Sequence, residues 1–124
     1  MAQCQRRGLY RAECRVRRVS MRSGNCRSHT SAGLTDRLDA ILSVDTVGVF
    51  KPDSRVYDLV GAHFGCEVEE VLFVSSNGWD AAAAAGYGFA TAWVNRADEP
   101  VDRLPWTPRH QLRDLTGIPE IAGV

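Results

Sequence analysis

The segment VLFVSSNGWD, residues 71–80, determines how the rest of the chain is interpreted. Its first four residues are all apolar and two of them are β-branched, as in a strand that is buried on both faces of a parallel sheet. Polar and small residues follow, and five consecutive alanines come directly after Asp80. Because alanine has the highest helix propensity, the pattern predicts a strand over residues 71–74 that passes directly into a helix over residues 79–86.

The same alternation of strand and helix extends to both sides of this segment. Short apolar runs predict strands over residues 40–44 and 89–94, and residues 111–115 are expected to form a short edge strand. Strands that alternate with helices usually pair in parallel through crossover connections. These patterns therefore predict an α/β fold with a parallel sheet and flanking helices.

Helices are predicted from apolar spacing and from residues that begin or end a helix. Residues 53–64 carry apolar side chains at helical spacing, Pro52 suits the first turn of this helix, and Gly65 is expected as its C-cap. Residues 34–38 are expected to end an earlier helix. Residues 118–122 are expected to form a last helical turn.

The composition is that of an ordinary globular protein, since 44% of the 124 residues are apolar and 24% are charged. This length suits one domain. No apolar run approaches the roughly 18 residues that a membrane span needs, and the N-terminus lacks the apolar region of a secretory signal. A cytoplasmic protein with no membrane partner is therefore expected.

The charged residues are distributed unevenly along the chain. Residues 1–33 contain eight arginines and a single acid, Glu13, whereas residues 34–124 contain seven basic and 14 acidic residues. The first 33 residues also show no apolar periodicity, so we expect them to pack no core. The chain is therefore divided into a basic segment that is disordered or out of frame, residues 1–33, and a folded part, residues 34–124.

Four interpretations of the basic segment remain open. Its arginine density suits a nucleic-acid-binding arm, and its lack of acids suits an organellar transit peptide. Cys14, Cys26 and His29 form the one cluster of metal-ligand type in this segment, but their spacing matches no zinc module. The favoured interpretation is a stretch read in the wrong frame or from a false start, so no nucleic-acid partner is expected.

The polar residues that follow the all-apolar strand allow two interpretations. Asn77 and Asp80 suit the capping of a helix N-terminus, which requires no function. Capping does not explain Ser75 and Ser76 at the end of a buried strand, where ligands bind in open parallel sheets. Lys51 alone would be a solvated surface residue, but together with this strand end it suggests a cation that faces an anionic nucleophile or substrate.

Two segments resemble known motifs. VGVFKPDSRVY, residues 47–57, and VLFVSSNGWD, residues 71–80, are similar to the third and fourth motifs of the haloacid dehalogenase superfamily. The form S-S-N-x-W-D is typical of its 2-haloacid dehalogenase branch, whereas its magnesium-dependent phosphatases usually carry paired acids here. The resemblance covers residues 33–124 and implies a partial Rossmann-like parallel sheet with flanking helices.

The resemblance also implies a function, that of an (S)-2-haloacid dehalogenase. Such an enzyme replaces the halogen of a small 2-haloacid with hydroxyl through an aspartyl ester, and it needs no metal or other cofactor. The residues that the resemblance implies in catalysis are Lys51, Ser75, Asn77 and Asp80. Those that it implies in substrate binding are Tyr57, Ser76 and Trp79.

Individual roles follow from the same resemblance. Lys51 would hydrogen-bond the nucleophile and offset its charge, and Tyr57 would line the pocket and help to hold Lys51. Ser75 would position the carboxylates, and Asn77 would lie near the departing halide. Asp80 would orient Lys51 and the hydrolytic water. A homodimer is compatible with the resemblance, although no dimer surface can be located from the sequence.

The N-terminal elements of the family have no counterpart in the sequence. The family's nucleophile follows its first strand in an Asp-x-x-Gly-Thr pattern, but no aspartate precedes Asp36. Residues 17–22 are not expected to form the buried strand of the second motif, and the helical cap domain is also absent. We therefore expect a sheet without its first two strands, in which residues 40–44 have no partner. The chain is predicted to be an inactive fragment or one half of a split protein.

Overall fold

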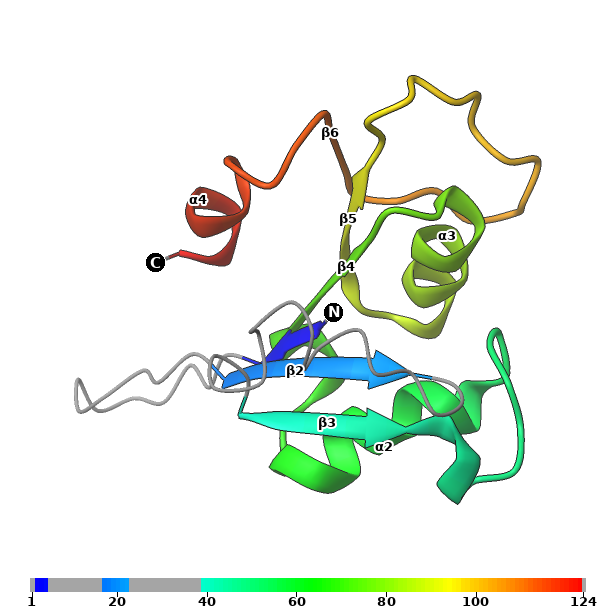
Figure 1. Ribbon diagram of the computed structural model, residues 1–124, viewed down its shortest axis with the longest axis vertical. Coiled ribbons are helices and arrows are strands. Elements are labelled where there is room, and N and C mark those ends of the chain that lie inside the picture. Colours follow the sequence, from blue (N-terminus) through cyan, green and yellow to red (C-terminus); the bar gives the residue numbers. More distant parts are fainter. Residues whose placement is uncertain (1, 5–16, 23–38, 124) are drawn as a thin grey trace, which may run out of the picture.

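Six strands form one sheet in the order β3-β2-β1-β4-β5-β6 (Figure 1). The computed structural model describes residues 2–4, 17–22 and 39–123. The strands are β1 (Ala2–Cys4), β2 (Arg17–Arg22), β3 (Ala40–Ser43), β4 (Val71–Ser75), β5 (Ala90–Val94) and β6 (His110–Leu112). The helices are α2 (Ser54–Phe64), α3 (Gly78–Tyr87) and α4 (Ile118–Ala122), with 3₁₀ turns η2 (Val44–Thr46) and η3 (Val68–Glu70).

Among these six strands, β1 alone runs against the others. It pairs antiparallel with both β2 and β4, whereas the β2–β3, β4–β5 and β5–β6 pairs are parallel. The five remaining strands therefore point in the same direction, and their carboxyl ends lie along one edge of the sheet. This edge is where ligands bind in open α/β sheets.

The predicted α/β fold is confirmed in the second half of the chain. β4, β5 and β6 pair in parallel, α2 precedes β4 and α3 follows it. Gly65 ends α2 in the left-handed conformation, with φ of 60°. The placement of Pro52 in the first turn of α2 is wrong, because the helix begins at Ser54. Asp53 is the N-cap, and its carboxylate accepts the backbone N–H of Arg55 over 3.0 Å.

Two predictions about the first part of the sheet are wrong. Residues 17–22 do form a strand, β2, and β3 pairs with it in parallel, so residues 40–44 are not left without a partner. The missed signal is an alternation of period two, because Val19 and Met21 alternate with polar residues. Met21 packs beside the hydrophobic core. The excess of arginine obscured this short strand pattern.

Other predictions fall on residues outside the described part of the chain. These are the helix end at residues 34–38 and the cluster of Cys14, Cys26 and His29. The division of the chain at residue 33 and the interpretation of the basic segment stay predictions, as does the cytoplasmic location. Within the described ranges, no helix is long and apolar enough to cross a membrane.

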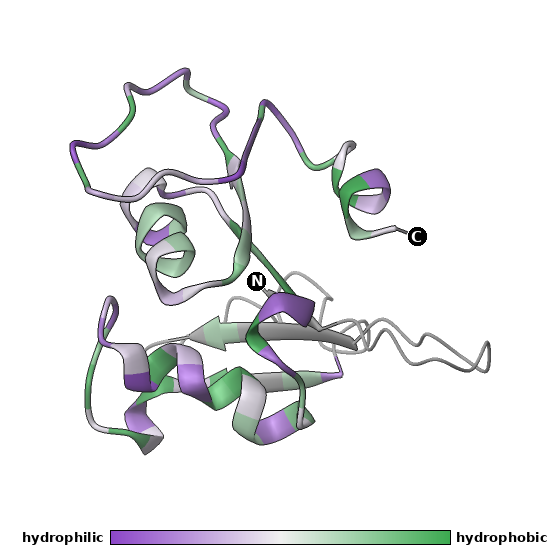
Figure 2. Ribbon diagram, turned by 180° about the vertical axis from the view of Figure 1, so that it is seen from behind, coloured by the Kyte–Doolittle hydropathy of each residue, from purple (hydrophilic) through white to green (hydrophobic). Residues whose placement is uncertain are grey.

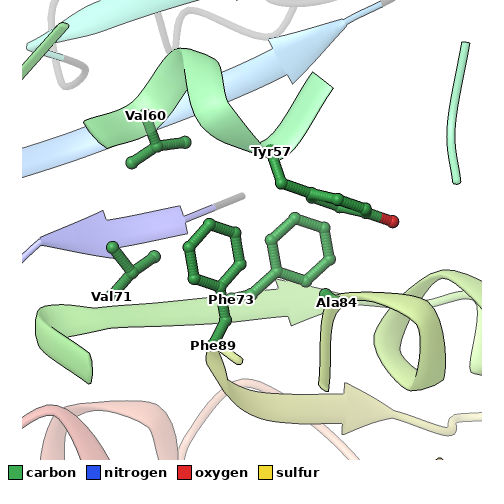
Figure 3. Close-up of a cluster of buried hydrophobic side chains, with 6 residues drawn as sticks. All are labelled: Tyr57, Val60, Val71, Phe73, Ala84 and Phe89. Carbon is green, nitrogen blue, oxygen red and sulfur yellow. The ribbon is translucent and has the colours of Figure 1, made fainter. Parts of the chain in front are cut away.

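One face of β4 supports the helices that carry functional residues. Val71 and Phe73 pack with Tyr57 of α2, Ala84 of α3 and Phe89, which precedes β5 (Figure 3). The Phe73 and Tyr57 rings meet edge to face, with centroids 5.8 Å apart. This packing fixes α2 and α3 against the same side of the sheet. Figure 2 shows the difference between these helices, since polar and apolar residues alternate along α2 whereas the alanine-rich α3 is mostly apolar.

The opposite face of β4 is covered by the last helix. Leu72 and Val74 pack in a second cluster with Ile118 and Ala122 of α4. Because successive side chains of a strand point to opposite faces, an all-apolar strand requires apolar neighbours on both sides. The burial of β4 on both faces, which its sequence predicted, is confirmed.

Candidate active site

Three side chains converge on Asp80, which lies in the first turn of α3 at the carboxyl end of β4. The Lys51 ammonium lies 2.9 Å from Asp80 Oδ2, and the Ser75 hydroxyl donates to the same oxygen over 3.0 Å. The Tyr57 hydroxyl donates to Asp80 Oδ1 over 3.2 Å. Asp80 is only 5% exposed, so these donors rather than water compensate its charge. Lys51, Tyr57, Ser75 and Asp80 are called the Asp80 cluster below.

The capping interpretation is wrong for the Asn77 side chain, and capping alone does not account for the contacts of Asp80 in the first turn of α3. Asn77 occupies the N-cap position of α3, but its side chain makes no capping hydrogen bond. Its backbone N–H instead donates to the Ser75 hydroxyl over 3.1 Å. Asp80 binds side chains from three other parts of the chain, and a helix N-terminus alone does not require such an arrangement.

Lys51 reaches the cluster from the loop between η2 and α2. Its Nζ atom also lies 4.9 Å from the centroid of the Phe73 ring, and only 20% of its side chain is exposed. A carboxylate and an aromatic face both attract a cation, so the ammonium is held in one place. The interpretation of Lys51 as a solvated surface residue is therefore wrong.

Tyr57 supports the cluster from α2. Its side chain is buried, it packs edge-on against Phe73 and Phe89, and its hydroxyl points away from both rings (Figure 3). Burial raises the pKa of Tyr57, and the negative charge of Asp80 raises it further. Tyr57 is therefore a neutral hydrogen-bond donor to Asp80 at physiological pH.

A pocket of about 260 Å³ opens beside the Asp80 cluster. Lys51 and Asp80 line it together with Asn77 and Trp79, both of which are exposed. The other lining residues are Met21, Val44 and Phe50. The pocket thus combines a cation, a carboxylate and an amide with apolar side chains, which suits a small anion that has an apolar part. Sequence patterns did not indicate Met21, Val44 and Phe50, because these residues come from separate elements.

Ser76 is not brought into this pocket. It is exposed, and its carbonyl accepts a hydrogen bond of 3.3 Å from the indole N–H of Trp93 on β5. The Trp93 ring also lies against Gly78, where a Cβ atom would come within 3.0 Å of the ring. Trp93 therefore holds the turn that carries Ser75 and Asn77. Nothing in the sequence of β5 distinguishes this tryptophan from an ordinary core residue.

Replacing Trp93 with phenylalanine should destabilise the protein by about 1.5 kcal/mol, because the substitution removes one hydrogen bond and leaves a gap in the core. Urea unfolding followed by far-UV circular dichroism measures this change. Trp106→Phe is the matched control, since Trp106 is 50% exposed and its replacement should change stability little. Equal losses in the two variants would contradict a holding role for Trp93.

Stability is expected to fall as the pH rises from about 10 towards 12. Burial raises the pKa of Tyr87 to about 12, helped by its hydrogen bond to Asp58. The unfolded chain releases the phenolic proton near pH 10, whereas the folded chain keeps it, so alkaline pH favours unfolding. Tyr87→Phe should make this fall shallower. Urea unfolding of both proteins at pH 8.0 and 10.5 tests the expectation, and identical slopes with pH would refute it.

Comparison with known proteins relates this geometry to one family. A family model described as haloacid dehalogenase-like hydrolase matches residues 23–88. The (S)-2-haloacid dehalogenase of Pseudomonas putida is 45% identical over 86 residues, which are 69% of this chain and 38% of that protein. The (S)-2-haloacid dehalogenase of Pseudomonas sp. strain YL is 43% identical over 90 residues, which are 73% of this chain and 39% of that protein.

Solved structures show the same relation. The L-2-haloacid dehalogenase from Xanthobacter autotrophicus superimposes with a TM-score of 0.72 and 31% identity, over 77% of this chain and 48% of that chain. The chain therefore spans less than half the length of these relatives. The family match begins at residue 23, inside the basic segment, residues 1–33, that was predicted to lie outside the folded part.

Proposed function

Because the chain belongs to the haloacid dehalogenase-like hydrolases, we propose that the Asp80 cluster and its pocket are part of an (S)-2-haloacid dehalogenase site. Such an enzyme converts a 2-haloacid and water into a 2-hydroxy acid and halide. The observation that carries the proposal is the convergence of Lys51, Tyr57 and Ser75 on one buried carboxylate. Relatives that bear this name, at 43% and 45% identity, support it.

Asp80 itself is proposed as a positioning group rather than as the nucleophile. Its carboxylate accepts hydrogen bonds from Lys51, Tyr57 and Ser75, so its oxygens are not free to approach a carbon atom. Its role would be to hold the Lys51 ammonium at the edge of the pocket. A fixed cation there would attract the carboxylate of a haloacid and hold an attacking carboxylate in position nearby.

The reaction requires a second carboxylate. An aspartate would attack the carbon that carries the halogen, and the halide would leave with the electrons of the broken bond. Water would then add to the carbonyl carbon of the aspartyl ester, releasing the 2-hydroxy acid and restoring the carboxylate. Asp80 is the one carboxylate among the described residues that line the pocket, and no aspartate precedes Asp36 in the chain. We therefore expect no halide release from these 124 residues alone.

The phosphatase alternative is less well supported than the dehalogenase site. A magnesium-dependent phosphatase of the same superfamily would usually carry a second acid beside Asp80, where this chain has Trp79 and Ala81. A non-catalytic fragment would not need an intact Lys51–Asp80 pair. Half of a split protein would need this pair together with a partner that supplies the nucleophile, and a fragment agrees with the coverage of only 38% of the Pseudomonas putida relative. The proposed homodimer rests on the family resemblance alone and stays a prediction.

A fusion protein tests the proposed function. The N-terminal part of the Pseudomonas sp. strain YL relative, up to its region of similarity, would be joined to residues 23–124 of this chain. We expect this fusion to release halide from (S)-2-chloropropionate, because it restores the missing carboxylate beside Lys51. Halide release is measured with an ion-selective electrode.

The unfused chain and a phosphatase substrate are the controls for this experiment. The unfused chain should release no halide from the same substrate. Phosphate release from p-nitrophenyl phosphate in the presence of Mg²⁺ would contradict the dehalogenase proposal and favour the phosphatase. Halide release by the unfused chain that disappears in Lys51→Met would show that the chain needs no second part.

A further inference from the structure

Two side-chain hydrogen bonds join α2 to α3 within the described part of the chain. The Tyr57 hydroxyl of α2 donates to Asp80 in the first turn of α3. The Tyr87 hydroxyl, at the end of α3, donates to Asp58 of α2. The first bond belongs to the Asp80 cluster. The second lies outside the cluster and outside the lining of the pocket beside Lys51, so the proposed function gives it no role.

The two bonds hold α2 at separate points along α3. Asp80 and Tyr87 are seven residues apart, so they lie on one face of α3, about 10 Å from each other along its axis. Tyr57 and Asp58 are consecutive, so their side chains leave α2 in directions about 100° apart. One hydrogen bond would leave α2 free to turn about the contact. Two bonds of different direction, at points two helical turns apart, fix the rotation of α2 against α3.

The bond from Tyr57 to Asp80 is sensitive to the placement of α2. Its donor and acceptor oxygens are 3.2 Å apart, which is long for a hydrogen bond between two oxygen atoms. Such a bond is lost at about 3.6 Å, so a shift of α2 by about 0.5 Å away from α3 would break it. Lys51 and Ser75 would stay on Asp80 after this shift, because they come from outside α2.

Ring packing alone does not place α2 to within this distance. The centroids of the Tyr57 and Tyr87 rings are 5.4 Å apart, and the rings are inclined by 40°. Aromatic pairs are favourable over centroid distances of about 4.5–7 Å, so the rings can slide by more than the shift that breaks the Tyr57 bond. A hydrogen bond is directional and weakens steeply when it is misaligned. The bond from Tyr87 to Asp58 therefore limits the movement that the ring contact allows.

We infer that Tyr87 is a positioning residue for the Asp80 cluster, because its hydrogen bond to Asp58 holds α2 where Tyr57 donates to Asp80. Tyr87 is half-buried and Asp58 is exposed, so either hydrogen-bonding group can be removed while the core stays in place. This structural statement concerns the chain as it exists. Its consequence for a reaction rate rests on the proposed function, in which Tyr57 helps to steady the carboxylate that holds the Lys51 ammonium.

Nuclear magnetic resonance of the unfused chain, labelled with ¹³C at the tyrosine Cζ atoms, tests the inference. The chain has three tyrosines, and variants that replace each of them with phenylalanine assign the signals. The Cζ chemical shift reports whether a phenol donates a hydrogen bond. At pH 7.5 we expect Tyr87→Phe to move the Tyr57 signal towards that of free tyrosine, in a chain that far-UV circular dichroism shows to be folded.

Asp58 supplies a matched pair of variants. Asp58→Asn keeps an oxygen that accepts the Tyr87 hydroxyl, so the Tyr57 signal should stay at its wild-type position. Asp58→Leu has a similar size but no acceptor, so it should move the Tyr57 signal as Tyr87→Phe does. A role of Tyr87 in stability alone would lower the free energy of unfolding and leave the Tyr57 signal of the folded chain unmoved.

Halide release by the fusion protein measures the consequence for the rate. Tyr87→Phe should lower kcat for (S)-2-chloropropionate about fivefold with little change in KM, which is the scale of one hydrogen bond. The same substitution should have no further effect in a fusion that already carries Tyr57→Phe, because Tyr87 acts through Tyr57.

Three results would overturn the inference. One is a Tyr57 signal that moves in neither Tyr87→Phe nor Asp58→Leu. Another is a signal that moves as far in Asp58→Asn as in Asp58→Leu, since the hydrogen bond would then not be the cause. The third is an equal loss of kcat from Tyr87→Phe with and without Tyr57→Phe. A fusion that releases no halide contradicts the proposed function alone, and the Tyr57 signal still decides the inference.

Discussion

Replacing Lys51 with methionine is expected to lower halide release by the fusion protein about 1000-fold, which is the effect of removing one preorganised donor from a site where charge develops. Methionine keeps the apolar stem of lysine but removes its ammonium. The Asp80 carboxylate would then have no cation, and neither would an attacking carboxylate nearby. The measurement is kcat/KM for (S)-2-chloropropionate, with the same protein preparation checked for folding by circular dichroism.

The same substitution should also destabilise the unfused chain by about 2 kcal/mol. This value lies between that of an exposed ion pair and that of a fully buried one, because the Lys51 side chain is 20% exposed and that of Asp80 is 7% exposed. Arg55→Met is the matched control, since the Arg55–Asp53 ion pair is exposed on the surface. We expect its loss to change neither stability nor halide release appreciably.

A double variant separates the two effects of Lys51. Asp80→Leu added to Lys51→Met removes the carboxylate that the first substitution leaves without its cation. Removal of the uncompensated carboxylate should restore part of the stability, with the lost acceptor of the Tyr57 and Ser75 hydroxyls limiting the recovery, and halide release should not recover. If halide release by Lys51→Met alone stayed within threefold of the parent fusion, Lys51 would have no part in the chemistry.

Replacing Phe73 with alanine is expected to have the largest effect on stability, a loss of about 4 kcal/mol. The Phe73 side chain is fully buried and its ring stacks on Phe89 and meets Tyr57 edge to face. Its removal leaves a cavity beneath the Asp80 cluster, and it removes the aromatic face beside the Lys51 ammonium. Because a domain is stable by only about 5–15 kcal/mol, the variant should be close to unfolding at 37 °C.

Phe73→Leu is the control for this prediction. Leucine fills most of the space, so the loss should stay below about 1.5 kcal/mol. Both variants are measured by urea unfolding at pH 7. A loss below 1.5 kcal/mol in Phe73→Ala would mean that this cluster is not the centre of the core. Phe73→Leu is also measured for halide release by the fusion protein. If kcat/KM falls strongly while the free energy of unfolding falls by less than about 1.5 kcal/mol, the aromatic face itself positions Lys51.

The second half of the fold was predictable because its signals are local. Residues 71–74 are apolar throughout, residues 81–85 are all alanine, and Gly65 ends α2 as expected. Each of these signals acts through neighbouring residues along the chain. The first part of the sheet was not predictable in the same way. β2 is short and rich in arginine, and its pairing with β3 depends on backbone hydrogen bonds that carry no side-chain signature.

The sequence likewise indicated which residues form the site. It did not indicate which hydrogen bonds join them. The motifs around Lys51 and Asp80 indicated which residues to consider. They did not show that Tyr57 bonds Asp80 rather than lining the pocket with Lys51, or that Trp93 holds the carbonyl of Ser76. Ser76 was expected in the substrate site, and the structure leaves it outside the described lining of the pocket.

Local composition thus accounts for the strands and helices of the second half of the chain, and the resemblance to the family's motifs accounts for the identity of most site residues. The packing of α2 and α3 on one face of β4 accounts for the rest. Lys51 and Asp80 are 29 residues apart and Tyr57 and Asp80 are 23 apart, so their contacts exist only when these elements are packed together. The contact between Trp106 and Gly86 has the same origin, because Trp106 reaches α3 from a loop that follows another strand. The distance between residues on two different elements cannot be predicted from periodicity along the chain. It depends on how the side chains between the packed elements fit together.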